Sequence, residues 1–143
     1  MSGHIISAFF ERLLFMTQLE IPYFFMRGGT SRGPYFNAAD LPDNRDEIAK
    51  ILLEVIGAGH PLNIDGIGGG NAVTNKVAIL SQSNTDESDI DYLFAQVSVT
   101  EQLVDFKPTC GNILSGVGPA AIEMGLMQAG DQVTNVRIKL INN

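Results

Sequence analysis

The feature that most constrains this fold is a glycine-rich apolar stretch from Ile113 to Leu126. It would place apolar side chains on nearly every side of a helix, and Glu123 is its only charged residue. A helix of this kind is usually enclosed by other elements. The stretch therefore predicts one buried helix beginning at about Ile113, with Asn112 as its N-cap, and a sheet folded around it. Pro119 indicates a kink in this helix or a later helix start.

The only cysteine of the chain, Cys110, lies just before this predicted helix. Free backbone N–H groups at a helix start carry partial positive charge, which favours a thiolate over a thiol. A thiolate is the form of cysteine that acts as a nucleophile or a base. The alternative is that Cys110 is a small buried hydrophobic residue, a common role for a lone cysteine.

A second candidate region follows the strand predicted over Leu19–Met26. The segment Arg27–Gly33 holds three glycines, two hydroxyl residues and two arginines. Such a backbone can approach an anion closely, and guanidinium groups bind carboxylates in a bidentate manner. The segment is equally compatible with a plain hairpin turn that carries two solvated arginines.

Another glycine-rich loop runs from Asp65 to Lys76. It is not a Walker A motif, because Lys76 follows Asn75 and precedes Val77, and the dinucleotide fingerprint fails at Asn71. A run of flexible backbone N–H donors before a lysine remains, which suits carboxylate capture and proton transfer. The alternative is a mobile loop with a surface lysine.

The rest of the chain predicts both kinds of secondary structure. An amphipathic helix is predicted from Ile48 through Gly57. Strands are predicted over 34–36, 76–81, 90–99 and 103–106 and, with the clearest alternation, over 133–141. We see no regular βαβ alternation, so the predicted class is α+β, with a largely antiparallel sheet around one buried helix.

Charge and length restrict the function classes. The net charge of −7 argues against nucleic-acid and anionic-membrane partners, so an anionic substrate needs a locally positive pocket. Residues 1–17 are too short and too charged to span a membrane, and they lack the features of a secretory signal. We expect these residues to be an N-terminal extension, with an amphipathic helix as the alternative, and we expect a single cytoplasmic domain without an internal disulfide.

Three motifs together resemble the PrpF family, most closely its 4-oxalomesaconate tautomerase branch. They are Arg27–Gly33, the loop from Asp65 through Lys76, and Cys110–Asn112. The resemblance runs from about Leu19 to the last residue. It implies a fold similar to diaminopimelate epimerase, in which two domains, each a curved sheet around a central helix, enclose an active site. It also implies isomerisation or tautomerisation of small unsaturated tricarboxylates, without a metal or organic cofactor.

The resemblance also implies roles for individual residues. Cys110 and Lys76 match the acid/base positions. The implied substrate-binding residues are Arg27, Gly29, Thr30, Ser31, Arg32, Gly69, Gly70, Asn71, Gly111 and Asn112. Arg32 stands where methylaconitate isomerases more often carry lysine, which favours the tautomerase branch, and Asn75 stands where serine is more usual.

Family members are far longer than this chain, so we expect residues 18–143 to be the N-terminal domain of a two-domain enzyme. We expect a small tricarboxylate as substrate, and either a homo-oligomer or a missing C-terminal domain as partner. The alternative is an inactive polycarboxylate-binding or interaction module. A nucleotide-binding protein is disfavoured because both fingerprints fail.

Overall fold

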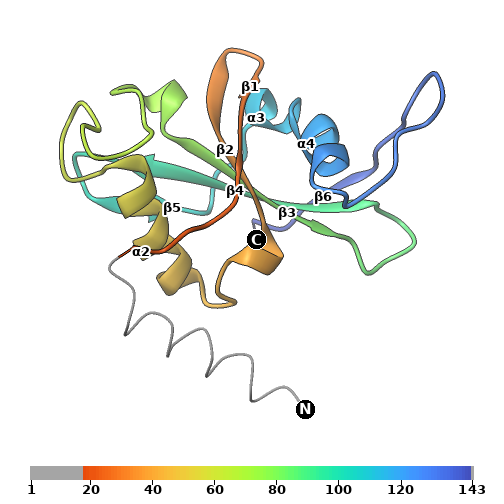
Figure 1. Cartoon of the computed structure of the whole chain (residues 1–143), viewed down its shortest axis with the longest axis horizontal. Helices are drawn as coiled ribbons and strands as arrows, with labels where there is room; N and C mark the ends of the chain where they lie inside the picture. The colour runs from red at the N-terminus through yellow and green to blue at the C-terminus, as the bar shows by residue number, and fades with distance from the viewer. Residues whose placement is uncertain (1–17, 143) are drawn as a thin grey trace.

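The computed structural model describes residues 18–142, which form a mixed six-stranded sheet with helices on both faces (Figure 1). The strands are β1 (Phe24–Gly28), β2 (Ser31–Asn37), β3 (Lys76–Gln82), β4 (Ile90–Ser98), β5 (Leu103–Asp105) and β6 (Ile138–Leu140). The helices are α2 (Arg45–Ile56), α3 (Gly111–Leu114) and α4 (Val117–Glu123), with short 3-10 turns η1 (Ala38–Asp40) and η2 (Ala72–Thr74). The predicted extension, residues 1–17, lies outside the described residues.

The sheet has the strand order β1-β2-β3-β4-β5, and β6 also pairs with β4. The pairs β1–β2, β3–β4 and β4–β5 are antiparallel, whereas β2–β3 and β4–β6 are parallel. The predicted α+β class with a mostly antiparallel sheet is confirmed. The sequence shows no regular βαβ alternation, but the structure contains one such crossover, because the chain passes through α2 between the parallel strands β2 and β3.

The segment Arg27–Gly33 forms the end of a β-hairpin rather than an open loop. Arg27 pairs with Arg32 and Gly28 with Ser31, so Gly29 and Thr30 alone form the turn. Gly29 has the positive φ of +52° that glycine tolerates at such a turn. The predicted strand over 19–26 begins later, at Phe24, because the preceding Pro22 cannot donate to a ladder.

The predicted amphipathic helix is confirmed as α2. Asn44 caps its start, accepting hydrogen bonds from the backbone N–H groups of Asp46 and Glu47, and Gly57 ends it in a left-handed conformation. The buried face carries Ile48, Leu52 and Ile56. These side chains pack on one face of the sheet.

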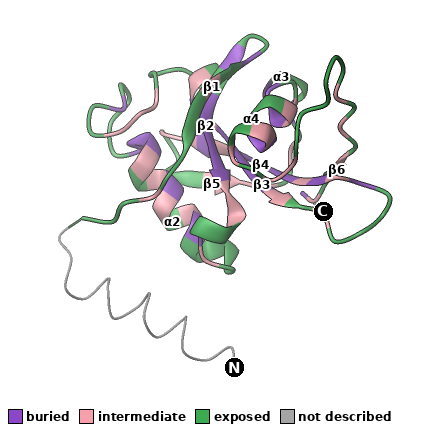
Figure 2. Cartoon of the chain, turned by 45° about the vertical axis from the view of Figure 1, so that its right-hand side comes forward, coloured by how far each residue is buried: buried purple, intermediate pink, exposed green. Residues whose placement is uncertain are grey.

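The sheet therefore separates two apolar cores. The core beneath α2 includes Phe36, Val77, Ile79, Leu93, Ala95 and Val97. The other core includes Tyr35, Ala78, Tyr92 and Phe94 from the sheet, together with Cys110, Ile113, Val117, Ala120 and Ala121. Strand alternation explains the division, since successive side chains point to opposite faces. Figure 2 shows the buried residues concentrated in the central strands and on the inner sides of the helices.

The helix predicted over 113–126 differs from the structure in three respects. The segment forms two short helices, α3 and α4, and Cys110 rather than Asn112 is the N-cap of α3. Glu123 is exposed and α4 buries one side only, so the segment is not enclosed all round. At the break, the Ile113 carbonyl, which a continuous helix would offer to the Val117 N–H, accepts hydrogen bonds from the Tyr35 hydroxyl at 2.7 Å and from the Gly116 N–H at 3.0 Å.

The strand predicted over 133–141 is also too long. Only Ile138–Leu140 pairs as β6. The backbone N–H of Arg137 donates instead to the Asp89 carboxylate at 2.8 Å, and its guanidinium pairs with the same carboxylate at 2.7 Å. Alternation of residue types identified the strand but not its length or its partner.

Among residues 18–142 there is no helix with the length and hydropathy that a membrane crossing requires.

Candidate active site

Lys76 and Cys110 come together between β3 and α3. Lys76 begins β3, and Cys110 directly precedes α3. The Lys76 ammonium donates to the Cys110 sulfur at 3.4 Å, and its nitrogen lies 5.4 Å from the centroid of the Phe94 ring. Cys110 is buried with 8% exposure, and Lys76 is half-buried. A thiol and an amine in contact can each hold or move a proton at one point of the structure.

The helix that follows Cys110 is too short to place much partial positive charge near its sulfur. The helix α3 is only four residues long, and a single turn has a much smaller dipole than a full helix. Lys76 is the cation that contacts the sulfur. The environment of Cys110 therefore depends on a residue 34 positions away in the sequence.

Asn112 joins the hairpin to this corner. Its side-chain oxygen accepts a hydrogen bond from the Thr30 backbone N–H at 3.2 Å. A Cβ at Gly28 or Gly29 would come within 2.3 Å of Asn112 oxygens, so only glycine allows this approach. Gly111 has open space beside it, with no atom within 4 Å of an added Cβ. Thr30, Gly29, Gly111 and Asn112 are thus brought to the Cys110 corner.

The two arginines lie apart from this corner. Arg27 and Arg32 face each other across the hairpin and are both exposed. Strand alternation puts them on the opposite face of the hairpin from Ser31 and Tyr35. The Arg32 guanidinium lies over the Phe25 ring and 2.8 Å from where a Cβ on Gly69 would sit. The structure groups Arg32 with Gly69 and does not show either arginine contacting Cys110.

Several N–H groups of the loop 65–76, which was expected to offer flexible backbone donors, are already hydrogen-bonded. The N–H groups of Ile67 and Gly68 donate to carbonyls at the end of α2, and that of Gly70 donates to the Asn63 side chain at 2.7 Å. Among residues 18–142, no hydrogen-bond partner is found for the N–H of Gly69 or of Asn71. The Asn71 side chain makes its hydrogen bond within the loop, because its oxygen accepts from the Val73 N–H and so caps η2.

Asn63, which sequence reasoning missed, holds this loop in place. It is 2% exposed, has a φ of 54°, and also donates to the Gly57 carbonyl at 3.3 Å. Asparagine tolerates left-handed backbone better than most residues. Its position before Asp65-Gly66 is a turn signal that was available in the sequence, although its two hydrogen bonds were not.

Two buried polar atoms near these segments lack hydrogen-bond partners within the described part of the chain. They are Ser31 Oγ, in a side chain that is 1% exposed, and Asn75 Oδ1. Leaving such atoms unpaired costs about 1 to 3 kcal/mol each. Ser31 is on the same strand face as Tyr35, so its buried hydroxyl lies on the Cys110 side of the hairpin.

Two tyrosines that lie behind Cys110 were also not among the site residues expected from the sequence. The Tyr92 hydroxyl donates to the Cys110 carbonyl at 3.5 Å, and the Tyr35 hydroxyl donates to the Ile113 carbonyl at 2.7 Å. Burial, and then the negative charge of Cys110, raises the pKa of Tyr35 to about 12. Burial is likewise the main cause that raises the pKa of Tyr92. Both hydroxyls therefore stay protonated donors at neutral pH.

Asn142 supports the strand that carries Phe94. Its side-chain nitrogen donates to the carbonyls of Phe94 at 2.8 Å and Phe106 at 2.7 Å, and its oxygen accepts from the Phe94 N–H at 3.2 Å. Asn142 is 6% exposed. No local sequence pattern singles out this residue, because its partners are distant in the chain.

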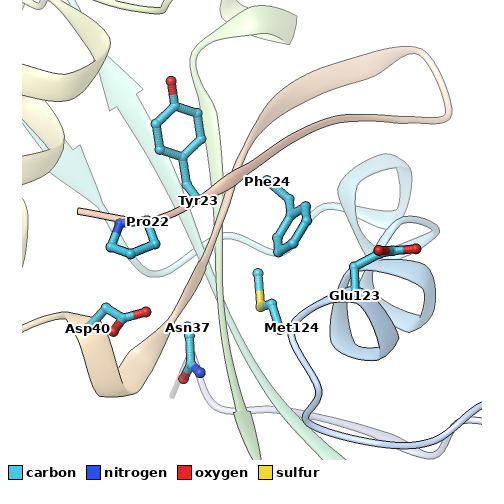
Figure 3. A pocket seen from close by; sticks show the side chains of 7 residues that line it. All are labelled: Pro22, Tyr23, Phe24, Asn37, Asp40, Glu123 and Met124. Atoms are coloured by element: carbon cyan, nitrogen blue, oxygen red, sulfur yellow. The ribbon is translucent and has the colours of Figure 1, made fainter. Parts of the chain in front are cut away.

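A hollow of about 220 Å³ between β1 and α4 is less suited to an anionic ligand (Figure 3). Its lining residues are Pro22, Tyr23, Phe24, Asn37, Asp40, Glu123 and Met124. The Phe24 ring points toward Met124, and the charged groups of the lining are the two carboxylates. Two carboxylates repel an anion, so an anionic ligand is better suited to the Cys110 corner than to this hollow.

Within residues 18–142, no group of three or more His, Cys, Asp or Glu side chains is placed to hold a metal ion.

Comparison with known proteins places these features in a family. The family model described as PrpF protein matches residues 18–143. The chain is 55% identical over 123 residues to YbhH of Escherichia coli (strain K12), a match covering 86% of this chain and 35% of that protein. It is 50% identical over 127 residues to 4-oxalomesaconate tautomerase of Pseudomonas putida (strain KT2440), covering 89% and 35%.

A crystal structure of methylitaconate-delta-isomerase matches with a TM-score of 0.84 and 39% identity, covering 89% of this chain and 33% of that one. At this identity the likeness extends to sequence as well as fold. The chain spans about a third of the length of the curated relatives it matches.

Proposed function

The chain belongs to the PrpF family, and we propose that it carries the thiol and amine of a cofactor-independent isomerase that shifts a proton on a small unsaturated tricarboxylate. The observation that carries the proposal is the 3.4 Å contact between Lys76 Nζ and Cys110 Sγ. The names of two relatives, a 4-oxalomesaconate tautomerase and a methylitaconate delta-isomerase, support this reaction class.

The proposed reaction is a 1,3-proton shift. One group of the Cys110–Lys76 pair removes a proton next to a carbonyl or carboxylate, and the electron pair of that C–H bond becomes part of an enolate. The other group returns a proton at the far end of the conjugated system, so the double bond moves and no atom is gained or lost. General acid–base groups of this kind each contribute about 10²- to 10⁴-fold in rate.

Substrate carboxylates are proposed to bind around the same corner. The Ser31 hydroxyl is buried without a partner among the described residues, and Gly111 borders open space. The Thr30 backbone N–H already donates to the Asn112 side chain, so these two residues are held in place before a ligand binds. Arg32 and the Gly69 backbone would meet a more distant carboxylate, because they lie on the other side of the hairpin.

The proposed active enzyme includes more chain than these residues. Relatives are about three times as long, and we propose that a second domain closes over the Cys110 corner in the two-domain arrangement of diaminopimelate epimerase. A closed site excludes water, which strengthens the electrostatic interactions within it. The exposed apolar side chains of Leu62 at 66% and Ile64 at 65% support a covering partner, either that domain or a second copy.

The experiment is an assay of the isolated chain with 4-oxalomesaconate in D₂O, which follows enol absorbance and deuterium incorporation, with Cys110→Ser as the matched control. We expect slow deuterium incorporation that needs Cys110. Failure of both tricarboxylate binding and Cys110-dependent exchange would contradict the proposal. Full turnover by a monomer would contradict the need for a second domain.

The second candidate function is a tricarboxylate-binding module without turnover. The Thr30–Asn112 contact and the Ser31 hydroxyl, which has no partner among the described residues, favour it, because these groups can bind a carboxylate without moving a proton. The same assay separates the two functions. A chain that binds a tricarboxylate in calorimetry but incorporates no deuterium above the Cys110→Ser control is a binding module.

A further inference from the structure

We propose that Tyr35 is a positioning residue whose hydroxyl anchors α3 to the sheet and thereby keeps the Cys110 thiol in contact with Lys76. The inference deepens the proposed function and rests on it only for the roles of Cys110 and Lys76. Tyr35 itself contacts neither reacting atom in our proposal. It acts through the backbone of the turn that carries Cys110.

The first step is the link from Tyr35 to Cys110. The Tyr35 hydroxyl donates to the Ile113 carbonyl at 2.7 Å, and Tyr35 is fully buried. The Leu114 N–H donates to the Cys110 carbonyl at 2.9 Å, so Cys110 and Ile113 belong to one closed turn. The N-cap residue of this turn, Cys110, makes no capping hydrogen bond with its side chain. A single helical turn depends on contacts with other elements for its position.

The second step is the link from Tyr35 to Lys76. Tyr35 on β2 pairs in register with Ala78 on β3, two residues beyond Lys76. Residues two apart on a strand share a face, so Lys76, Ala78 and Tyr35 all face the core that holds Cys110. Tyr35 therefore connects the part of the sheet that bears the amine to the helix that bears the thiol.

The third step is the space reserved for the hydroxyl. A Cβ added to Gly28 would lie 2.7 Å from the Tyr35 hydroxyl oxygen, and one added to Gly116 would lie 2.3 Å from it. The oxygen is thus enclosed by two backbone segments that only glycine can supply. The other hydroxyl contact from the sheet to this turn, from Tyr92 to the Cys110 carbonyl, is longer at 3.5 Å.

The fourth step is electrostatic. The ionisable groups that face Cys110 from the strands packed against it are Lys76, Tyr35 and Tyr92. Burial and the negative charge of Cys110 raise the pKa of Tyr35 to about 12, so its hydroxyl is neutral at physiological pH. Replacing it with phenylalanine removes no charge. A change in thiol reactivity would then report the geometry between Cys110 and Lys76.

The test measures the rate of Cys110 alkylation by iodoacetamide from pH 5 to 10 in the native chain and in Tyr35→Phe. We expect the variant to react about three- to tenfold more slowly at pH 7 and to show an altered dependence of rate on pH, as the loss of one buried hydrogen bond would allow. In a Lys76→Met background, Tyr35→Phe should have no further effect on the alkylation rate, because the contact between Lys76 and Cys110 that Tyr35 maintains is already absent.

Two controls separate positioning from loss of stability. Ile56→Val removes one carbon from the core beneath α2, on the other face of the sheet from Cys110. It should lower the melting temperature and leave the alkylation rates unchanged. Gly116→Ala keeps the tyrosine, but its Cβ would meet the hydroxyl end of the Tyr35 ring and push it away from the Ile113 carbonyl, so it should reproduce the effect even if Tyr35→Phe does not fold. A folded Tyr35→Phe or Gly116→Ala with the native profile, or equal slowing in the Lys76→Met background, would overturn the proposal. Alkylation needs no turnover, so these outcomes are independent of whether the chain is an active isomerase.

Discussion

Lys76 Nζ lies 3.4 Å from Cys110 Sγ, and this contact joins the first residue of β3 to the N-cap residue of α3. The two residues are 34 positions apart in sequence and lie in different elements. The contact brings the only thiol of the chain and a strand lysine into one corner of the molecule. Several measurable properties should follow from this contact and from the residues around it.

Cys110 should be alkylated faster than a free thiol at neutral pH, because an adjacent cation favours the reactive thiolate. A tricarboxylate should protect it, since the ligand would occupy the same corner. The measurement is the rate of iodoacetamide labelling with and without citrate, with acetate as the control anion. Slow labelling that citrate leaves unchanged would point to a purely structural cysteine.

Replacement of Lys76 by methionine should lower isomerase activity by about 10²- to 10⁴-fold, the contribution of one acid/base group. Methionine keeps an apolar contact with the Phe94 ring, over which the amine now lies. The folded state should therefore persist, as circular dichroism would show. The prediction fails if the variant keeps the turnover of the native chain in the same assay.

Asn63→Ala should loosen the glycine loop by removing the hydrogen bonds to the Gly70 N–H and the Gly57 carbonyl. We expect a loss of about 1 to 3 kcal/mol in the free energy of unfolding, together with faster amide exchange at Gly70. Asn63→Gly is the matched variant, because glycine accepts the φ of 54° but lacks the side chain. Amide exchange that is slow at Gly70 in both variants would show that Asn63 does not hold the loop.

Asn142→Leu should destabilise the chain by at least about 2 kcal/mol, because it leaves backbone groups of Phe94 and Phe106 without partners. The measurement is urea unfolding. Asn135→Leu is the control, since Asn135 is exposed and should give little change. Similar unfolding midpoints for the two variants would remove Asn142 from the supports of β4.

The Asp89–Arg137 pair predicts a small acid-dependent contribution to stability. Hydrogen bonds from the Arg137 side chain, then from its backbone, lower the pKa of Asp89 below 3.8. A group whose folded-state pKa is lowered stabilises the fold above its unfolded value, and this contribution is lost as pH falls through the folded value. Asp89→Asn should therefore reduce the loss of thermal stability between neutral pH and about pH 3. Both side chains are solvent-accessible, so the effect is small.

The sequence by itself was sufficient for the elements that depend on local pattern. The apolar spacing of α2 and its glycine end predict that helix, and the apolar runs of β3 and β4 predict those strands. The three motifs also indicated the family and singled out Cys110 and Lys76 as candidates. These inferences need only residue types and their spacing along the chain.

Only the tertiary structure decided the features that depend on contacts between distant segments. At the break in the expected helix, the Tyr35 hydroxyl from a strand reaches the Ile113 carbonyl, and just before β6 a distant carboxylate accepts the Arg137 N–H. The parallel pairing of β2 with β3, and the meeting of Lys76 with Cys110, are likewise properties of the packed chain. Local periodicity reports which face of a segment is apolar, whereas the partner of that face is selected by packing against the rest of the fold.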